Sequence, residues 1–271
     1  MKSIFLLTGS LLMAFAFTSS NAVLEWQKLE EGLHFVEFIP SPAPQIGNGK
    51  ISILKIDPHK FEFDLPSAKN PGETTLTASN WAKKKNLVAV VNTGMFLNDY
   101  KTNKGYMEHF GNKNNPQLNS DNTIAAFNPK SKDVPAFQLI DRKCQNWDLL
   151  KKKYNSFAQS IRMVDCQQKN RWSLQPKMWS MVILGEDKEG NALFIFTRSP
   201  HKVHNFINIL LGSSIELKKA MYLEGGPEAS LHINHPKKRL TLFGSYETGF
   251  YENDGNDREW PIPNVIGIRR K

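Results

Sequence analysis

Two segments of the sequence each run from an apolar stretch into a polar residue that is followed by glycine. They read VVNTGMF at 90–96 and MYLEGGPE at 221–228. Glycine at such a place permits unusual backbone angles and a close approach of the backbone to a ligand. Strand ends beside glycine-rich turns are also where sheet-based enzymes collect their sites. An ordinary exit from a strand into a turn would explain either segment alone, but the two together indicate a site around Asn92 and Glu224.

Four short elements follow one another in a defined order along the chain. They read NTGMF at 92–96, GYME at 105–108, QSIR at 159–162 and LEGGPE at 223–228. This ordered set resembles the phosphodiester glycosidase family, whose elements include Asn-Ala-Gly-Met-Phe, Gly-Leu-Tyr-Val-Glu, Gln-Ser-Gly-Pro and Leu-Asp-Gly-Gly-Gly-Ser-Ser. The resemblance extends over residues 51–268.

The sequence departs from the family pattern at several of these positions. The family's Asp is Glu224 here, and its third Gly and the following Ser are Pro227 and Glu228. Family members usually place an Arg before the strand that here reads SMVILGED, but the stretch PKMW at 176–179 contains none. Arg162 stands instead where many relatives have Gly-Pro. The departures imply a divergent member, in which Arg162 supplies the lost charge or hydrolysis has been lost.

The resemblance implies an exported glycoside hydrolase that cleaves a sugar-1-phosphodiester, N-acetylglucosamine-like, at the anomeric carbon. The products would be a free sugar and a phosphomonoester. This chemistry needs a carboxylate to activate water or to stabilise an oxocarbenium-like centre, and cations or N–H donors for the phosphate. One alternative is a non-catalytic sugar-phosphate-binding or glycan-binding envelope protein on the same fold. Another is a basic structural protein of the envelope.

The resemblance also implies which residues would carry the chemistry. Glu224 is the first choice for the catalytic carboxylate, and Glu228, Asp165 and Glu108 are candidates for the second acid. The expected substrate-binding residues are Asn92, Thr93, Gly94, Glu108, Gln159, Ser160, Arg162, Arg198, Gly225 and Gly226.

Three of these residues have a second interpretation. Arg162 and Arg198 suit phosphate because a planar guanidinium bonds two oxygens at once, but either could equally form a salt bridge or lie in solvent. Arg198 also precedes Ser199-Pro200, an expected helix start whose free N–H groups could receive an anion. Asn92 would bind sugar hydroxyls or an acetamido group, or alternatively form an Asx turn.

The two cysteines, Cys144 and Cys166, are expected to form a disulfide, because an even cysteine count is typical of exported chains. A pair of buried thiols is the alternative. His201 and His204 lie three residues apart on an expected helix, but no third ligand is near them in the sequence. No metal or other cofactor is therefore expected.

The first 22 residues have the features of a secretory signal peptide. Lys2 precedes the apolar stretch IFLLTGSLLMAFAF, and Ser20-Asn21-Ala22 provides a small-x-small cleavage site. The stretch is shorter than the ~20 residues that a spanning helix needs, which disfavours a retained membrane anchor. We expect an exported, periplasmic or extracellular protein whose domain spans residues 23–271, without stable membrane insertion after cleavage.

The chain is basic, with a formal net charge of +9 in its 271 residues. Much of this charge lies in short runs of lysine and arginine, which are usually solvated faces. The runs lack the interleaved aromatic residues of a single-strand binder, so no nucleic-acid partner is expected. The expected partner is a glycan or sugar-phosphate substrate.

Hydrophobic patterns predict one α+β domain with a mixed, largely buried β-sheet flanked by helices. The valine-rich run at 87–92 is typical of a fully buried strand. The polar stretch 93–123 is expected to be a long functional loop or lid, with a short strand at GYMEH (105–109). Helices are expected near 77–85, at 146–157 and after Ser199-Pro200, and strands at 51–58, 61–65, 123–129, 136–141, 158–166, within 178–199, and at 220–224.

Overall fold

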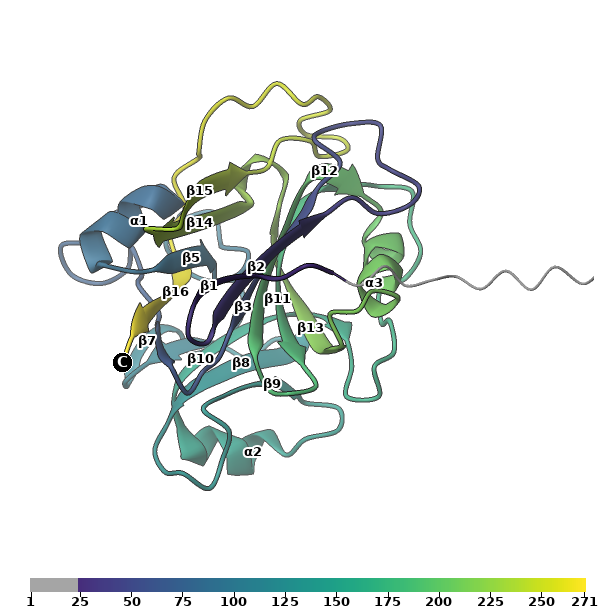
Figure 1. Ribbon diagram of the computed structural model, residues 1–271. Helices are drawn as coiled ribbons and strands as arrows, with labels where there is room; N and C mark the ends of the chain where they lie inside the picture. Colours follow the sequence, from purple (N-terminus) through teal and green to yellow (C-terminus); the bar gives the residue numbers. More distant parts are fainter. Residues whose placement is uncertain (1–23) are drawn as a thin grey trace, which may run out of the picture.

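The computed structural model describes residues 24–271 and shows two antiparallel β-sheets that pack on each other (Figure 1). The predicted signal peptide lies outside the described residues. Within them, no helix is both long and apolar enough to cross a bilayer.

The larger sheet contains eleven strands. Its main path runs β1-β2-β3-β12-β11-β13-β10-β6-β7, while β8 pairs with β10 and β9 pairs with β8. The bounds are β1 Gln27–Glu30, β2 Leu33–Phe38, β3 Ile51–Ile56, β6 Met107–His109, β7 Asn112–Asn115, β8 Asn122–Pro129, β9 Phe137–Asp141, β10 Tyr154–Val164, β11 Trp179–Asp187, β12 Ala192–His201 and β13 Leu217–Gly225.

The smaller sheet has five strands in the order β15-β14-β5-β16-β4. The helices are few and short; α1 packs against the middle strands of the smaller sheet and α3 against the larger sheet (Figure 1). The strand bounds are β4 Phe61–Asp64, β5 Ala89–Asn92, β14 Ser230–His235, β15 Lys238–Phe243 and β16 Val265–Arg270; the helices are α1 Ala78–Lys85, α2 Trp147–Leu150 and α3 Val203–Leu211, with 3₁₀ turns η1 Lys151–Lys153 and η2 Gly226–Glu228.

The predicted α+β class with a mixed sheet flanked by helices is wrong, because the chain is 44% strand and 11% helix. Every strand pair within the described residues is antiparallel. The run at 87–92 is buried as expected, because the larger sheet covers one face of the strand and α1 covers the other. Val91 packs into the core between the two sheets, while Val90 packs with Trp81 of α1.

The local predictions had mixed outcomes. The helix near 77–85 is confirmed as α1, with the Thr77 side chain accepting a hydrogen bond from the Asn80 N–H at 3.2 Å. The helix predicted at 146–157 is largely wrong, because α2 ends at Leu150 and β10 already begins at Tyr154. In β10 the Tyr154 and Phe157 rings are buried with Trp147 in a small core of their own, which favours the strand.

The predicted helix start at Ser199-Pro200 is also wrong. Both residues belong to β12, and α3 begins at Val203 after Lys202. The buried Ser199 hydroxyl accepts a hydrogen bond from the Gly49 N–H at 2.8 Å, so it fixes a distant loop instead of capping a helix.

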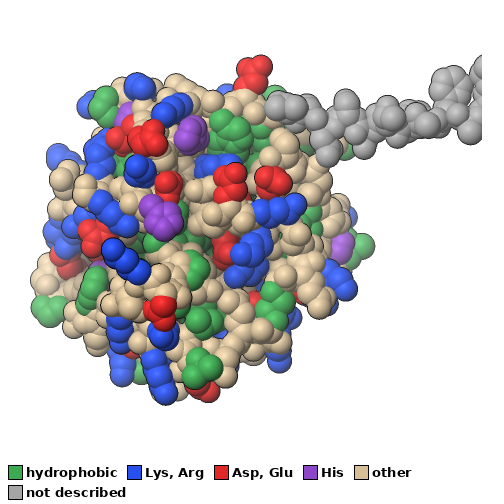
Figure 2. All heavy atoms as spheres, turned by 60° about the horizontal axis from the view of Figure 1, so that its bottom comes forward, with side chains coloured by type: hydrophobic (Ala, Val, Ile, Leu, Met, Phe, Trp, Pro, Cys, Tyr) green, Lys and Arg blue, Asp and Glu red, His purple; other side chains and the backbone are tan. Residues whose placement is uncertain are grey.

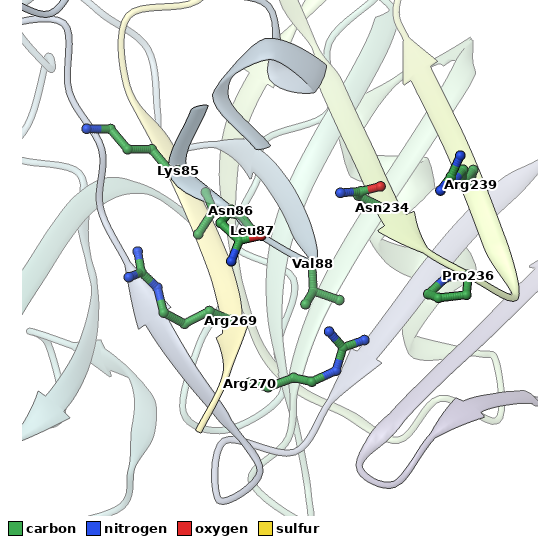
Figure 3. Close-up of a pocket in the computed structure, with 9 residues that line it drawn as sticks. All are labelled: Lys85, Asn86, Leu87, Val88, Asn234, Pro236, Arg239, Arg269 and Arg270. Carbon is green, nitrogen blue, oxygen red and sulfur yellow. The ribbon is translucent and has the colours of Figure 1, made fainter. Parts of the chain in front are cut away.

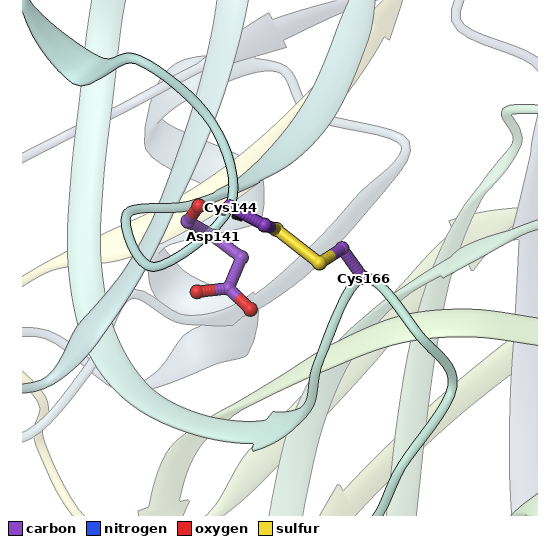
Figure 4. Close-up of side chains that lie close together, drawn as sticks. All are labelled: Asp141, Cys144 and Cys166. Carbon is purple, nitrogen blue, oxygen red and sulfur yellow. Dashed lines mark hydrogen bonds between the residues drawn. A yellow bond between two sulfur atoms is a disulfide. The ribbon is translucent and has the colours of Figure 1, made fainter.

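The predicted disulfide between Cys144 and Cys166 is present, with the two Cα atoms 6.7 Å apart (Figure 4). It links the turn after β9 to the turn after β10. Asp141 lies beside the bond, but both sulfur atoms are joined to each other and do not form a thiolate metal site with it.

The charge runs lie on a mixed surface. Figure 2 shows Lys and Arg side chains spread among Asp and Glu side chains over the face that it displays. Several lysines of the runs form ion pairs, such as Lys84 and Lys85 with Glu73 and Lys153 with Asp133. Most of the basic charge on this face is therefore distributed and solvated.

Candidate active site

A pocket of about 350 Å³ at the end of β13 brings together three carboxylic acids. Glu224 comes from β13 itself, Glu228 from η2, and Glu247 from the loop that follows β15. The rest of the lining is mainly apolar: Met95, Phe96, Tyr222, Gly225 and Phe250.

A β-bulge precedes the first of these acids. In the pairing of β11 with β13, Ile183 lies opposite Tyr222 and Val182 lies opposite Glu224, so Leu223 is an extra residue. Bulges bend a strand and change the direction of its side chains, and they are frequent beside active sites. The bulge thus helps to set the direction in which Glu224 leaves the sheet.

The environment of Glu224 favours its protonated form. The side chain keeps only partial contact with solvent, and burial raises its pKa to about 8. The like charges of Glu228 and Glu247 act in the same direction, whereas the Gly225 N–H, 3.1 Å from Oε1, and the charge of Lys104 oppose them. Near neutral pH most Glu224 side chains therefore carry a proton that they can donate.

Burial also raises the pKa values of Glu228 and Glu247. The charge of Glu247 raises the pKa of Glu228 further, whereas the charge of Lys177 lowers the pKa of Glu247. Three acids that repel one another cannot all ionise easily in one small pocket. Ionisation of one of these acids therefore opposes ionisation of the other two.

Glu247 was not among the candidates from the sequence. It lies in YETGF at 246–250, an acid close to a glycine, which is the kind of signal used for the other two segments. Its loop is attached to the start of β11, where the Ser180 N–H bonds the Tyr246 carbonyl at 2.9 Å and the Thr248 N–H bonds the Met178 carbonyl at 3.1 Å. Only this tertiary attachment brings Glu247 to the end of β13.

Arg198 holds the other end of the same loop. Its Nε lies 2.7 Å from Asp254 Oδ1, and its NH2 group donates to the carbonyls of Asp254 and Asn256 at 3.0 and 2.8 Å. Its NH1 group donates to the Phe243 carbonyl at 3.1 Å. Arg198 is not part of the pocket lining. Its guanidinium, which was predicted to bind phosphate, instead bonds Asp254 and carbonyl groups of this loop.

The glycines after Glu224 are required by close packing. A Cβ on Gly225 would collide with the Tyr222 hydroxyl and would lie 2.6 Å from Trp179 Cδ1. Gly226 has φ of +61°, and a Cβ there would meet the carboxylate of Glu247. Neither position tolerates a side chain without movement of the pocket wall.

Asn92 joins the two predicted segments directly. Its Nδ2 donates to the Glu228 carbonyl at 3.0 Å, and its Oδ1 accepts from the Ser230 N–H at 2.8 Å. The side chain is buried and ties the end of β5 to the turn that carries Glu228. This geometry is a cross-strand link, neither an Asx turn nor a free hydrogen-bonding group.

The next two residues lead from Asn92 to the pocket wall. Thr93 is buried and its Oγ1 has no hydrogen-bond partner among the described residues. A Cβ on Gly94 would lie 3.2 Å from Asn103 Oδ1, also buried and unpartnered, and 3.5 Å from Ser160 Oγ. A polar region with unsatisfied acceptors thus lies under the segment whose Met95 lines the pocket.

Gln159 and Glu108 support the strands. Gln159 Oε1 accepts from the Tyr106 N–H at 3.0 Å and from the Asn119 N–H at 3.2 Å, while its Nε2 donates to the Asn119 carbonyl at 3.1 Å. Glu108 accepts a hydrogen bond from the Tyr106 hydroxyl. Neither side chain lines the pocket.

Arg162 and Asp165 belong to the region around the disulfide. Arg162 NH1 lies 3.1 Å from each carboxylate oxygen of the buried Asp141. Asp165 accepts from the Lys169 N–H at 2.9 Å and pairs with Arg171 at 2.5 Å, contacts that help to keep its pKa below the usual value. The structure does not bring Arg162 or Asp165 to the three acids of the pocket.

Residues 85–269 match the sequence model of the phosphodiester glycosidase family. The matched span is more than half of the chain. The protein belongs to the phosphodiester glycosidase family. The four ordered elements of the sequence had led to the same family.

Two solved structures resemble this chain. A hypothetical protein from Synechocystis superposes with a TM-score of 0.58 at 12% identity, over 93% of this chain and 65% of the other. The zebrafish N-acetylglucosamine-1-phosphodiester alpha-N-acetylglucosaminidase catalytic domain, auto-inhibited by its pro-peptide, superposes with a TM-score of 0.55 at 14% identity, over 96% and 87%. This chain therefore spans about two thirds of the Synechocystis protein. At these identities the likeness concerns the fold, and no curated protein matches the chain.

In this member of the phosphodiester glycosidase family, Glu224, Glu228 and Gly225 of the predicted site line one pocket. The other predicted site residues do not line this pocket. The residues that sequence reasoning missed are Met95, Phe96, Tyr222, Glu247 and Phe250 in the lining, and Lys104 and Lys177 as nearby cations.

Proposed function

We propose that this member of the phosphodiester glycosidase family is an exported hydrolase of sugar-1-phosphodiesters, with an N-acetylglucosamine-like sugar. The observation that carries the proposal is the pocket in which Glu224, with a pKa of about 8, lies beside Glu228 and Glu247. Family membership supports the reaction class. The disulfide supports export, because such bonds persist mainly in oxidising compartments.

The three acids divide the proton transfers of hydrolysis. Glu224 is protonated near neutral pH and donates its proton to the phosphate oxygen as the bond from that oxygen to the anomeric carbon breaks. Glu228 or Glu247, when ionised, takes a proton from water while the water oxygen bonds the anomeric carbon. The products are a free sugar and a phosphomonoester, and the proton taken from water restores the total held by the three acids.

The apolar walls suit the carbon-bound faces of a sugar ring. Phe96 and Phe250 lie at the pocket, and Phe250 is 61% exposed, so its ring is available to a ligand. Hydroxyl or acetamido groups of the sugar would reach the polar region at Thr93 and Gly94, where the buried Thr93 Oγ1 and Asn103 Oδ1 lack partners among the described residues. Substrate binding at Thr93 and Gly94 is part of the proposal, and Asn92 holds the turn that carries Glu228 beside them.

Two lysines are better placed than the predicted arginines to attract the phosphate. Lys104 and Lys177 are exposed, and their charges lower the pKa values of Glu224 and Glu247, so each lies within electrostatic range of the pocket. Arg162 and Arg198 are occupied by Asp141 and by the loop 244–256. We therefore assign the phosphate side of the pocket to the lysines.

The test is release of sugar from an N-acetylglucosamine-1-phosphodiester by the pure chain without its leader. Glu224→Gln keeps the shape of the side chain but has no acidic proton to donate, and should lower kcat at least about a hundredfold. Glu62→Gln, an exposed substitution on β4, is the matched control and should leave kcat unchanged. Absence of sugar release from a panel of such diesters, or equal rates for wild type and Glu224→Gln, would refute the proposal.

The second candidate is a protein that binds sugar phosphates without turnover. It is favoured by the absence of a guanidinium among the residues that line the pocket. Calorimetry with a sugar phosphate separates the two functions. Saturable binding that Glu224→Gln does not alter, with no product formed over long incubation, identifies the binding protein.

A further inference from the structure

A second pocket, of about 420 Å³, lies at the opposite end of the smaller sheet from the candidate active site (Figure 3). We call it the basic pocket; it is lined by Lys85, Asn86, Leu87, Val88, Asn234, Pro236, Arg239, Arg269 and Arg270. We propose that the basic pocket is a non-catalytic binding site for the phosphate groups of an anionic polymer.

The two pockets are separated by the length of a strand. Next to the basic pocket, the Asn234 N–H bonds the Val88 carbonyl at 2.8 Å. At the other end of the same two strands, the Ser230 N–H bonds Asn92 Oδ1 at 2.8 Å beside the turn that carries Glu228. Val88 and Asn92 are four residue steps apart along the strand, a distance of about 13 Å. A ligand in the basic pocket therefore leaves the three acids free.

Three guanidinium groups give the basic pocket most of its hydrogen-bond donors. Arg239 forms no side-chain hydrogen bond or ion pair within residues 24–271. Arg269 contacts Asp64 through NH2, and Arg270 contacts Glu30 through Nε at 2.8 Å. Each guanidinium has five N–H donors, so most of the donors remain available to phosphate oxygens.

Three acids around the basic pocket are engaged with a cation. Glu73 pairs with Lys85 at 2.7 Å, while Asp64 and Glu30 pair with Arg269 and Arg270. A fourth acid, the exposed Glu62, lies opposite Arg269 in the pairing of β4 with β16, so the four cations and four acids are equal in number. The unpaired Arg239 and the exposed half of the Arg270 side chain are the groups that an incoming anion meets first.

The spread of the cations favours a polymer over a single phosphate ion. Figure 3 shows the guanidinium groups of Arg269 and Arg270 leaving the end of β16 in opposite directions, with Arg239 beyond Asn234 and Pro236. Consecutive side chains of a strand point to opposite faces, so Arg269 and Arg270 offer separate contacts, which suits successive phosphates of a chain. No aromatic residue lines this pocket, so it lacks a stacking platform for nucleic-acid bases.

The test measures binding of linear inorganic polyphosphate to the full mature chain at low salt, by calorimetry. Arg239→Gln/Arg270→Gln should weaken binding at least about tenfold, because two charge-assisted contacts are lost. Lys143→Gln/Lys152→Gln removes the same charge from exposed positions elsewhere and should change the affinity less than twofold. Arg239→Gln alone, which breaks no contact of the folded chain, should weaken binding severalfold and excludes misfolding as the cause.

Four outcomes would overturn the proposal: no binding of polyphosphate by the wild type; equal weakening in both double variants; inorganic monophosphate binding as tightly at equal phosphate concentration; or tighter binding of a single-stranded oligonucleotide. Glu224→Gln should bind polyphosphate as the wild type does. The basic pocket can thus be tested whether or not the pocket at Glu224 hydrolyses phosphodiesters.

Discussion

The raised pKa of Glu224 predicts that this residue makes the folded protein less stable as the pH rises. An unfolded chain releases the Glu224 proton near the ordinary value of 4.5, whereas the folded chain retains it until about pH 8. Between these values the folded state binds the extra proton, so the free energy of unfolding falls by about 1.4 kcal/mol per pH unit. The upper limit is about 5 kcal/mol, and the partial contact of Glu224 with solvent reduces the expected loss to about 2–3 kcal/mol.

Glu224→Gln removes this proton binding, so the variant should gain stability over the wild type as the pH rises. Urea unfolding followed by tryptophan fluorescence at pH 5 and pH 9, with the disulfide intact, measures the difference. The free energy of unfolding of Glu224→Gln minus that of the wild type should be about 2–3 kcal/mol larger at pH 9. The control Glu62→Gln, exposed on β4, should show no such change. A difference for Glu224→Gln that is equal at both pH values would refute the assignment of a raised pKa.

Three further substitutions test the pocket. Lys177→Met removes a charge that lowers the pKa of Glu247, so the acid limb of the pH–rate profile should move to higher pH in steady-state assays. Arg198→Met should lower stability by about 2–3 kcal/mol and speed proteolytic cleavage within 244–256, because an ion pair and three carbonyl contacts are lost. Gly226→Ala should lower stability by about 1–3 kcal/mol in thermal unfolding, since φ is positive and the Glu247 carboxylate fills the space. An unchanged pH–rate profile would contradict the prediction for Lys177→Met, and an unchanged cleavage rate would contradict the prediction for Arg198→Met. An unchanged unfolding temperature would contradict the prediction for Gly226→Ala.

The sequence predicted those parts of the site that depend on local pattern. The ends of β5 and β13 could be found because apolar runs stop at a polar residue followed by glycine, and both ends do meet through Asn92 and Glu228. The disulfide could be inferred from cysteine number and the expected export. The family followed from short elements in a fixed order, which survive substitutions at individual positions.

The remaining parts depend on partners that are distant in the sequence. Nothing near Arg198 reveals that Asp254 and the loop after β15 will occupy its guanidinium, and nothing near Arg162 reveals Asp141. The fold class failed for a related reason. A run such as 87–92 has the same apolar pattern whether helices or a second sheet cover it, so periodicity identified the strand without identifying its cover.

Lys177 keeps a positive charge near the pocket although the arginine that is usual in the family is missing. The stretch before β11 lacks the expected Arg, yet Lys177 lies there and its charge acts on Glu247. Lysine retains a positive charge for attraction of phosphate but lacks the planar fork that fixes two oxygens at once. Glu247, the third acid of the pocket, comes from the loop 244–256, and the positive charge of Lys177 lowers its pKa. The departures at Glu224 and Glu228 therefore lie in one pocket with Lys177 in electrostatic range, and the proposed hydrolysis depends on protonation of these carboxyl groups.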